Sequence, residues 1–511
     1  WLIKLKIDSR IIHKDSLPAK RGKILDRNGR VLALDVIGFT LEIDNFFQPS
    51  SVQILPLANI LEVNKSFILE RVNKKGNYKV LKRFITEEQK GKIELLNLPG
   101  LHYRKKLKRN YPQMEISSHV VGITDTERVG IEGTEKVLDR LLKGTDGIFK
   151  GVKGPIGVME GVRNSPIDGQ NLMLTIDIRL QSIAYDELKK AVEFYGASSG
   201  SIITINPGNG DILALTNFPS FNPSNRKNLK DLSSVRNRAT IDVFQPGSVV
   251  KPFAMSAIID SGKVKKKSKI NTSPGWIELG GYKTRDFRDY GFISLSEIIS
   301  YSSNVGMVKL CKDQNSDFLL EYLSNFGFGK PTSSVLIPTR AGFLQESFVV
   351  ISDRDKVSLC YGYGLSMTLV QIAQAYQVFA NKGVFQELNL FQEDLLRSRE
   401  PQHRVISEDT ANYINRMLFQ AVNSSHGTGR KARIEGLHVA GKTGTAETDL
   451  EEKKSYTATF SGFAPANDPR LLSVVVLHDL TGKEHSGGSV AAPIFSKVMK
   501  QSLHALDVGS S

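Results

Sequence analysis

The chain has 511 residues, 40% hydrophobic and 24% charged, a composition that excludes a disordered protein and exceeds one ordinary domain. A net charge of +15 makes nucleic acid the first partner to consider. The basic residues are dispersed, however, with short clusters at Lys105–Arg109 and Lys265–Lys267 and no nucleic-acid-binding motif. We therefore expect no nucleic-acid partner and interpret the clusters as a solvated face, with attraction to anionic lipid or a carboxylate polymer as the alternative.

The cysteines and histidines give no sign of a metal site. Cys311 and Cys360 are too few for a disulfide framework, and we expect two packed thiols because both lie in apolar stretches. None of the nine histidines has metal-binding spacing, so we expect no metal and no cofactor. The start at Trp1–Ile3 is short of an apolar span of ~18 residues and is interpreted as the end of a removed membrane anchor or as a domain boundary.

The first part of the chain predicts a small domain of its own. Arg21–Gly29 predicts a short strand followed by an Asn-Gly hairpin turn. Gly144–Gly169 is rich in glycine and proline and has no sustained period, which indicates a boundary. We therefore place a first domain at residues 1–165 and a second at 166–511.

The second part predicts strands at both ends with helices between them. Asp177 is a cap residue for a long amphipathic helix that ends near Phe194. The other expected elements are a strand at Leu172–Ile176, a hairpin of Ser201–Ile205 with Ile212–Thr216, a helix at Thr368–Asn381, and a strand pair of Tyr456–Phe463 with Leu471–Leu477. This order predicts an α+β domain whose sheet joins distant parts of the chain.

A first candidate for chemistry is Ser248 with Lys251, a Ser-x-x-Lys pair on one face of a helix. Serine becomes a nucleophile only beside a base, and lysine is a base only when burial or nearby positive charge lowers its pKa. Ser224–Lys227 has the same spacing, but it lies in a polar loop and we discount it.

Two further patterns are weak when taken singly. Ser302 and Asn304 form Ser-x-Asn, which alone more often caps a helix. Lys442–Thr445 continues a formal phosphate-loop pattern that begins at Gly436, but the alternating apolar residues before Lys442 predict a strand. We therefore reject nucleotide binding. Asp286–Asp289 pairs charges in a loop and is interpreted as a surface ion pair rather than a catalytic dyad.

The three patterns occur in the order typical of penicillin-binding proteins and class A β-lactamases. The chain resembles a class B penicillin-binding protein over nearly its whole length. Further resemblances lie at Phe244–Ser248, Gly487–Pro493, Arg109–Pro112 and Gly130–Lys136, and the last of these is similar to division-specific members. The resemblance implies an antiparallel sheet flanked by helices, as in serine β-lactamases, preceded by an elongated mixed α/β pedestal of the dimerisation type at residues 1–165.

The resemblance also implies a serine-type D-Ala-D-Ala transpeptidase without a cofactor. Ser248 would attack the penultimate D-Ala of a stem peptide, Lys251 would take its proton, and Ser302 would relay that proton to the leaving amine. The residues carried over are Ser248, Lys251, Ser302, Asn304 and Lys442 as catalytic groups, and Thr443, Gly444 and Thr445 as substrate-binding groups.

The resemblance implies peptidoglycan stem peptides and β-lactams as ligands. It also implies a membrane glycosyltransferase and other division proteins as partners, and a single-pass inner-membrane anchor with the catalytic domain in the periplasm. Three alternatives stay open: a silent β-lactam sensor or division scaffold, an elongation-specific transpeptidase, and a β-lactamase, which the pedestal disfavours.

Overall fold

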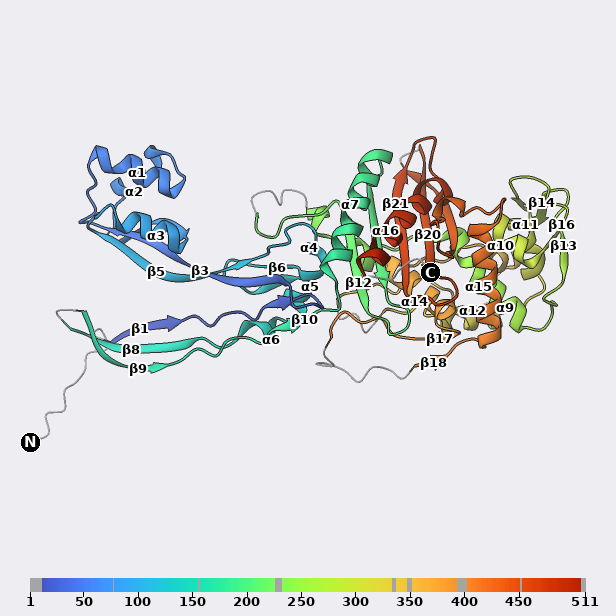
Figure 1. Cartoon of the computed structure of the whole chain (residues 1–511), viewed down its shortest axis with the longest axis horizontal. Coiled ribbons are helices and arrows are strands. Elements are labelled where there is room, and N and C mark those ends of the chain that lie inside the picture. The colour runs from blue at the N-terminus through green and yellow to red at the C-terminus, as the bar shows by residue number, and fades with distance from the viewer. Residues whose placement is uncertain are drawn as a thin grey trace, which may run out of the picture. The chain divides into compact units, whose positions relative to one another are not determined.

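The computed structural model describes residues 12–76, 78–154, 157–225, 232–332, 337–346, 352–392, 402–450 and 453–506. The chain forms two compact units (Figure 1). The first runs to residue 172 and the second from residue 173, except that 26–30 and 113–120 group with the second. Among the described helices, none has both the length and the apolar character that a bilayer crossing requires.

The first unit is organised around one long strand. β3 (Val31–Asp44) pairs antiparallel with β2 (Ile24–Leu25) across the Asn-Gly turn, which confirms that prediction, and also with β4 (Tyr78–Ile85) and β5 (Leu101–Asn110). Leu41, Ile43 and the other apolar residues of one sheet face form a core with the helices between the strands. The other elements are β1 (Ile12–Leu17), α1 (Ser51–Leu61), α2 (Lys65–Asn73), α3 (Glu87–Glu94), β6 (Ile123–Thr124), β7 (Gly130–Glu132), α5 (Gly133–Val137), α6 (Asp139–Lys143), β8 (Gly147–Gly154) and β9 (Gly157–Asn164).

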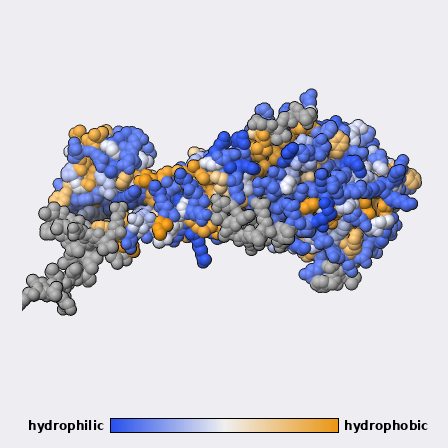
Figure 2. Space-filling model, turned by 60° about the horizontal axis from the view of Figure 1, so that its bottom comes forward, coloured by the Kyte–Doolittle hydropathy of each residue, from blue (hydrophilic) through white to orange (hydrophobic). Residues whose placement is uncertain are grey.

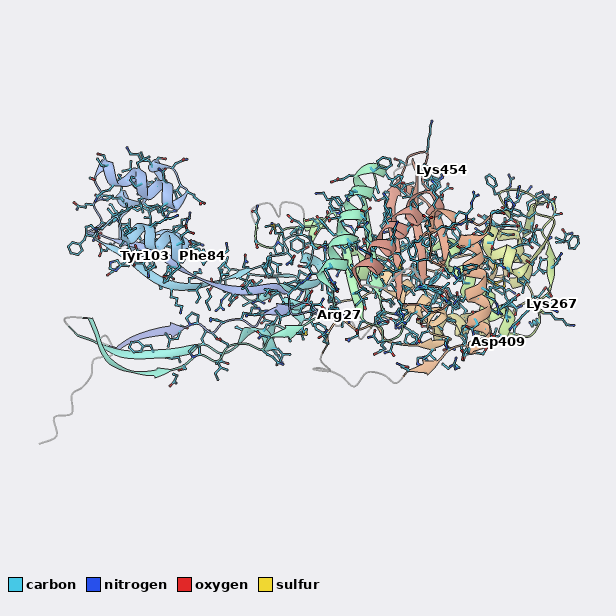
Figure 3. The ribbon with its side chains drawn as sticks, viewed as in Figure 1. Arg27, Phe84, Tyr103, Lys267, Asp409 and Lys454 are labelled. Carbon is cyan, nitrogen blue, oxygen red and sulfur yellow. A yellow bond between two sulfur atoms is a disulfide. The ribbon has the colours of Figure 1, made fainter. Side chains whose placement is uncertain are left out.

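The basic cluster on β5 does two different things. Lys105 and Lys108 are exposed, as a solvated face requires, and Lys108 Nζ lies 5.3 Å from the centre of the Phe84 ring (labelled in Figure 3). Arg109 is only 4% exposed, so the prediction of a solvated face is wrong for this residue. Strand alternation explains the difference, because neighbouring side chains on β5 point to opposite faces of the sheet.

Arg109 belongs to a buried ionic network. Its Nε donates to Glu135 Oε1 at 2.7 Å, and Arg21 Nε donates to Glu135 Oε2 at 2.5 Å. Arg21 also reaches Asp139 at 2.6 Å, while Arg128 donates to Asp35 at 2.7 Å. Since each buried charge has a partner of opposite sign, loss of any one member would leave an uncompensated charge in the interior.

The second unit is built on a five-stranded antiparallel sheet with the strand order β12-β11-β21-β20-β19. These strands are β11 (Ser199–Ile205), β12 (Ile212–Phe218), β19 (Ala440–Leu450), β20 (Lys453–Ala464) and β21 (Leu471–Leu480). Every residue of β11 is buried, because α7 (Ile178–Tyr195) and α16 (Ala492–Ala505) cover one sheet face and α14 (Leu369–Ala380) packs on the other (Figure 1). The sheet therefore joins segments from both ends of the unit, as predicted.

Most of the expected local elements are confirmed. Asp177 accepts from the Arg179 N–H at the start of α7, and Thr368 caps α14 by accepting from the Gln371 N–H. The expected strand at Leu172–Ile176 is shorter than predicted, since β10 covers only Leu172–Met173. The remaining elements are α4 (Ser118–Val121), η2 (Leu232–Val235), α8 (Arg238–Ile241), η3 (Gly247–Val250), α9 (Lys251–Asp260), β13 (Lys269–Asn271), β14 (Trp276–Leu279), β15 (Tyr282–Arg285), β16 (Phe292–Ser294), α10 (Leu295–Tyr301), α11 (Asn304–Cys311), α12 (Ser316–Asn325), α13 (Asp353–Leu359), β17 (Val384–Phe385), β18 (His403–Arg404), α15 (Glu408–Asn423), η5 (Arg430–Ala432) and η6 (Gly487–Ala491).

The surface of the second unit matches the dispersed charge of the sequence. Hydrophilic residues cover most of it on the face shown in Figure 2. In the basic cluster Lys265–Lys267, Lys265 and Lys267 are exposed and Lys266 pairs with Asp409 (Lys267 and Asp409 are labelled in Figure 3). This exposure fits both the predicted solvated face and the alternative of attraction to an anionic surface.

The expectation of two packed thiols is wrong. Cys311 and Cys360 form a disulfide, and both are fully buried. Cys311 is the last residue of α11 and Cys360 directly follows α13, so the bridge joins these two helices. Sequence spacing could not reveal this pair, because the two cysteines are 49 residues apart and each lies in an apolar stretch.

We expect replacement of both cysteines by alanine (Cys311→Ala with Cys360→Ala) to lower the free energy of unfolding of the second unit by about 2–4 kcal/mol, the usual effect of removing such a bridge. Urea unfolding followed by tryptophan fluorescence measures this. Reductant should destabilise the parent protein similarly and leave the double variant unchanged. If reductant does not change the unfolding of the parent protein, the disulfide is absent.

Candidate functional site

Ser248 lies in the 3₁₀ turn η3, directly before α9. Gly247 precedes it at φ +59°, a left-handed conformation that favours glycine, and its N–H donates to Gly362 O at 3.2 Å. One residue later, Tyr376 Oη donates to Val249 O at 2.7 Å. The backbone on both sides of Ser248 is therefore held in place, while its side chain is half-buried and lines a cavity.

An aromatic cluster anchors the helix that follows. Phe253 is 1% exposed, and its ring centre lies 4.9–5.1 Å from those of Phe326, Phe328, Tyr376 and Phe379. Since aromatic pairs at such distances add to the free energy of burial, α9 is fixed in the core two residues after Lys251.

The Lys251 amine is fully buried and has three oxygen partners. Its Nζ donates to Asn304 Oδ1 at 2.7 Å, to Ser302 O at 2.5 Å and to Ser302 Oγ at 3.1 Å. Among these described residues, Lys251 Nζ makes no hydrogen bond to Ser248. Burial lowers the pKa of Lys251 to about 7, against a smaller opposing effect of the Asp286 carboxylate. A substantial share of the amine is therefore neutral near neutral pH, as a base requires.

Ser302 and Asn304 reach Lys251 from a tight turn between two helices. Ser302 ends α10 in the left-handed conformation at φ +59°, and Ser303 caps α11 by accepting from the Gly306 N–H at 2.9 Å. The predicted capping function is thus present, but it belongs to Ser303. This leaves the Ser302 hydroxyl and the Asn304 amide free to face the buried amine.

Lys442, Thr443, Gly444 and Thr445 lie on the edge strand β19, which confirms that the segment is a strand and not a phosphate loop. Thr443 and Thr445 line the cavity with Ser248. Thr443 Oγ1 donates to Thr428 Oγ1 at 3.0 Å, and the Gly487 N–H donates to Thr445 Oγ1 at 3.0 Å.

Gly444 allows β19 to pass close to the nucleophile. A Cβ atom at this position would lie 2.6 Å from Pro246 O and 3.0 Å from Val249 Cγ1. Because one of these neighbours is backbone, it has little room to move. Any larger residue would push the strand away from Ser248.

The two lysine amines share one hydroxyl. Lys442 is fully buried, and its Nζ donates to Ser302 Oγ at 3.0 Å and to Thr443 O at 3.1 Å. Burial, with repulsion from Lys251, holds the pKa of Lys442 well below its usual range. Protonation of one amine therefore disfavours protonation of the other, and Ser302 Oγ connects them.

The cavity has a volume of about 550 Å³ and a cationic rim. Ser248, Ser302, Thr443 and Thr445 lie in its wall, together with the rim side chains Arg288, Arg430 and Lys431. The described residues that line it include no Asp or Glu. Hydroxyl groups beside positive charge are suited to a carboxylate ligand.

Sequence reasoning missed three groups at this site. Thr428, which supports Thr443, lies in a short segment between two glycines and resembles an ordinary loop in the sequence. Tyr290 and Tyr301 stack with ring centres 5.0 Å apart at the cavity wall. No spacing rule connects Thr428 or Tyr290 to the three motifs, because each lies in a loop of its own, and Tyr301 has no motif position although it directly precedes Ser302.

The interpretation of Asp286–Asp289 as a surface ion pair is wrong for Asp286. Its carboxylate accepts from Ser303 Oγ at 2.5 Å, from the Asn304 N–H at 2.5 Å and from the Val305 N–H at 3.0 Å. In the second Ser-x-x-Lys sequence, which we discounted, Ser224 does not line the cavity and Lys227 lies outside the described residues.

Two family models match the chain. The penicillin binding protein transpeptidase domain matches residues 200–500, and the penicillin-binding protein dimerisation domain matches residues 16–174. The chain is 35% identical to the probable peptidoglycan D,D-transpeptidase PbpC of Pseudomonas aeruginosa, over 98% of this chain and 89% of that protein. It is 34% identical to the peptidoglycan D,D-transpeptidase FtsI of Escherichia coli K12, over 98% and 86% of the two chains.

Solved structures resemble the whole chain. Penicillin binding protein 3 from Mycobacterium tuberculosis, complexed with aztreonam, superposes with a TM-score of 0.75 and 26% identity, covering 97% of this chain and 98% of that one. A peptidoglycan synthetase from Bifidobacterium adolescentis gives a TM-score of 0.76 at 25% identity, covering 98% of both chains.

The buried amine of Lys251 gives a direct test of this site. In protein carrying ¹³C at the lysine ε-carbon, the Lys251 NMR signal should titrate with a midpoint at about pH 7, whereas the signals of exposed lysines titrate at ~10.4. Lys251→Met should remove this signal. Lys497→Met, which changes a mostly exposed side chain, should leave it in place. If the signal lost in Lys251→Met titrates with the exposed lysines, the depressed pKa is wrong.

Proposed function

Because this chain belongs to the class B penicillin-binding proteins of the FtsI type, we propose that it is a serine-type peptidoglycan D,D-transpeptidase of septal cell-wall synthesis. Ser248 carries the acyl group, and the ligands are stem peptides and the β-lactams that mimic them. The observation that carries the proposal is the convergence of the Lys251 and Lys442 amines on the Ser302 hydroxyl, which lines the same cavity as Ser248.

In the first half-reaction, Ser248 Oγ attacks the carbonyl of the penultimate D-Ala and loses its proton to Lys251. The C–N bond to the terminal D-Ala then breaks, and the leaving amine takes a proton through Ser302 Oγ. An ester to Ser248 and free D-Ala result. The pKa of Lys251, about 7, supports a neutral amine as the acceptor of the first proton.

The terminal carboxylate of the stem peptide would bind where hydroxyls and cations meet. Thr443 and Thr445 present their side chains to the cavity, Gly444 keeps the strand close to Ser248, and Arg430 lies on the rim. We assign the oxyanion hole to the backbone N–H groups of Ser248 and Thr445. Removing one such donor typically costs 10²–10³ in rate.

The buried amines need only one proton between them. Ser302 Oγ lies 3.1 Å from Lys251 Nζ and 3.0 Å from Lys442 Nζ, so its hydroxyl connects both. When Lys442 carries the proton, its charge favours a neutral Lys251 and attracts the substrate carboxylate. Asn304 fixes the Lys251 amine through the 2.7 Å hydrogen bond to its Oδ1.

The fate of the acyl-enzyme separates a transpeptidase from a β-lactamase. Hydrolysis needs a base that activates water, and the described residues lining the cavity include no carboxylate. We propose that the amine of a second stem peptide resolves the ester and that β-lactam adducts persist. Hydrolysis within seconds would favour a β-lactamase.

Placement and partners follow from the same proposal. A disulfide between Cys311 and Cys360 supports an oxidising compartment, since such bridges are rare in reducing cytosol. We propose a periplasmic catalytic domain, a single-pass inner-membrane anchor, and a membrane glycosyltransferase with other division proteins as partners. The boundary between residues 165 and 166, and the pedestal function of the first domain, stay predictions.

A fluorescent penicillin should label the protein with one equivalent, and Ser248→Ala should abolish labelling because the ester can form only on that hydroxyl. Ser224→Ala is the matched control, because Ser224 begins the other Ser-x-x-Lys sequence. It should label normally. Labelling that persists in Ser248→Ala would refute the nucleophile assignment.

Turnover of a thioester stem-peptide mimic separates an enzyme from a silent sensor or scaffold. We expect thiol release and, with an added D-amino acid as acceptor, transfer of the acyl group to its amine. One equivalent of thiol without further release would indicate a protein that is acylated but does not turn over.

A further inference from the structure

We propose that Asp286 is a positioning residue for the reaction: its carboxylate holds the turn that presents Ser302 and Asn304 to the Lys251 amine. This inference rests on the proposed function, because its effect is measured on acylation of Ser248. Asp286 follows directly after β15 and belongs to none of the three motifs.

The first support is the number of groups that one carboxylate binds. Asp286 Oδ2 accepts from Ser303 Oγ at 2.5 Å, while Oδ1 accepts from the backbone N–H groups of Asn304 at 2.5 Å and Val305 at 3.0 Å. The first amides of a helix have no partner inside it, and a negative charge at this end is favourable. Asp286 thus fixes three consecutive residues at the start of α11.

The second support is the orientation of the Asn304 side chain. Its Nδ2 donates to Arg285 O at 3.3 Å, one residue before Asp286, and its Oδ1 accepts from Lys251 Nζ. The same short segment therefore holds both the backbone and the amide of Asn304. If this segment moved, the amide oxygen would leave the amine.

The third support is the placement of Ser302. This residue takes a left-handed conformation between two helices, and both its carbonyl oxygen and its hydroxyl accept from Lys251 Nζ. Such a conformation costs free energy for a residue other than glycine and persists only where its neighbours fix it. The bonds of Asp286 to the next three residues supply that constraint on one side, and α10 supplies it on the other.

Charge gives the carboxylate a second effect. The charged groups that face the Lys251 amine are Lys442 from β19 and Asp286 from the segment after β15; Tyr290 faces Asp286 in turn. The Asp286 charge raises the pKa of Lys251, against the larger lowering by burial. Removal of this charge must therefore lower the pKa of Lys251 further.

Asp286→Asn separates these effects from a loss of folding. We measure the rate constant for acylation by penicillin and divide it by the fraction of protein that can be labelled. We expect this value to fall about 10- to 100-fold, as for the loss of a charged hydrogen-bond acceptor. The acid limb of its pH profile, set by the neutral fraction of Lys251, should move to lower pH. A variant that was merely less stable would have fewer labelled sites but an unmoved limb.

Asp289→Asn is the matched control. Asp289 lies in the same loop and accepts from Ser273 Oγ and the Gly291 N–H, with no bond to the turn. It should keep the parent rate and pH profile. Asp286→Glu, which restores the charge but not the geometry, should keep the parent limb at a reduced rate.

The outcomes are distinguishable from failure of the proposed function. If the parent protein is not labelled at Ser248, the function itself fails. If it is labelled and Asp286→Asn shows the parent rate and the parent acid limb, Asp286 has no positioning function. A lowered rate with an unmoved limb would contradict the electrostatic half of the proposal.

Discussion

Two lysine amines, both withdrawn from solvent, meet at a single serine hydroxyl, and the site depends on that constraint. Water would keep both amines charged, and a charged amine accepts no proton. Burial lowers the pKa of both Lys251 and Lys442, and repulsion from Lys251 lowers the pKa of Lys442 further. The fold must therefore exclude water here while providing three oxygen partners for each amine, which requires a helix, a turn and a strand from distant parts of the chain.

This constraint explains which elements surround the two amines. The sheet brings β19 to its edge, the aromatic cluster around Phe253 fixes α9, and the turn between α10 and α11 closes the third side. Each element is stabilised by its own packing, and only their common position makes the site. The first unit shows the same logic in its ionic network, where Glu135 is fully buried because Arg21 and Arg109 both bind it.

Much of the fold could be predicted from the sequence because its signals are local. The caps at Asp177 and Thr368 and the strand character of Lys442–Thr445 depend on a few adjacent residues. The three motifs also indicated which side chains would meet. Local patterns could not show toward which distant residues a loop would turn. Asp286 contacts residues 17 to 19 positions away, and nothing near it in the sequence indicates which way its loop turns.

The same limit applies to the cysteines and to Arg109. An apolar sequence context is compatible with a packed thiol and with a buried disulfide. It therefore does not indicate that Cys311 and Cys360 are bonded to each other. A run of basic residues on a strand does not indicate which side chains are buried until the pairing of that strand is known. In the structure β5 pairs with β3, and Arg109 is buried.

The crowding behind Ser248 limits how the site can vary. A methyl group at Gly362 would lie 1.9 Å from Gly247 O, and one at Gly444 would lie 2.6 Å from Pro246 O. The backbone around Ser248 therefore has no room for a side chain at either glycine, whereas a cavity-lining side chain such as Phe287, which is 97% exposed, can change without a clash. Drug-resistant variants of this protein should accordingly carry their substitutions around the cavity entrance and keep both glycines.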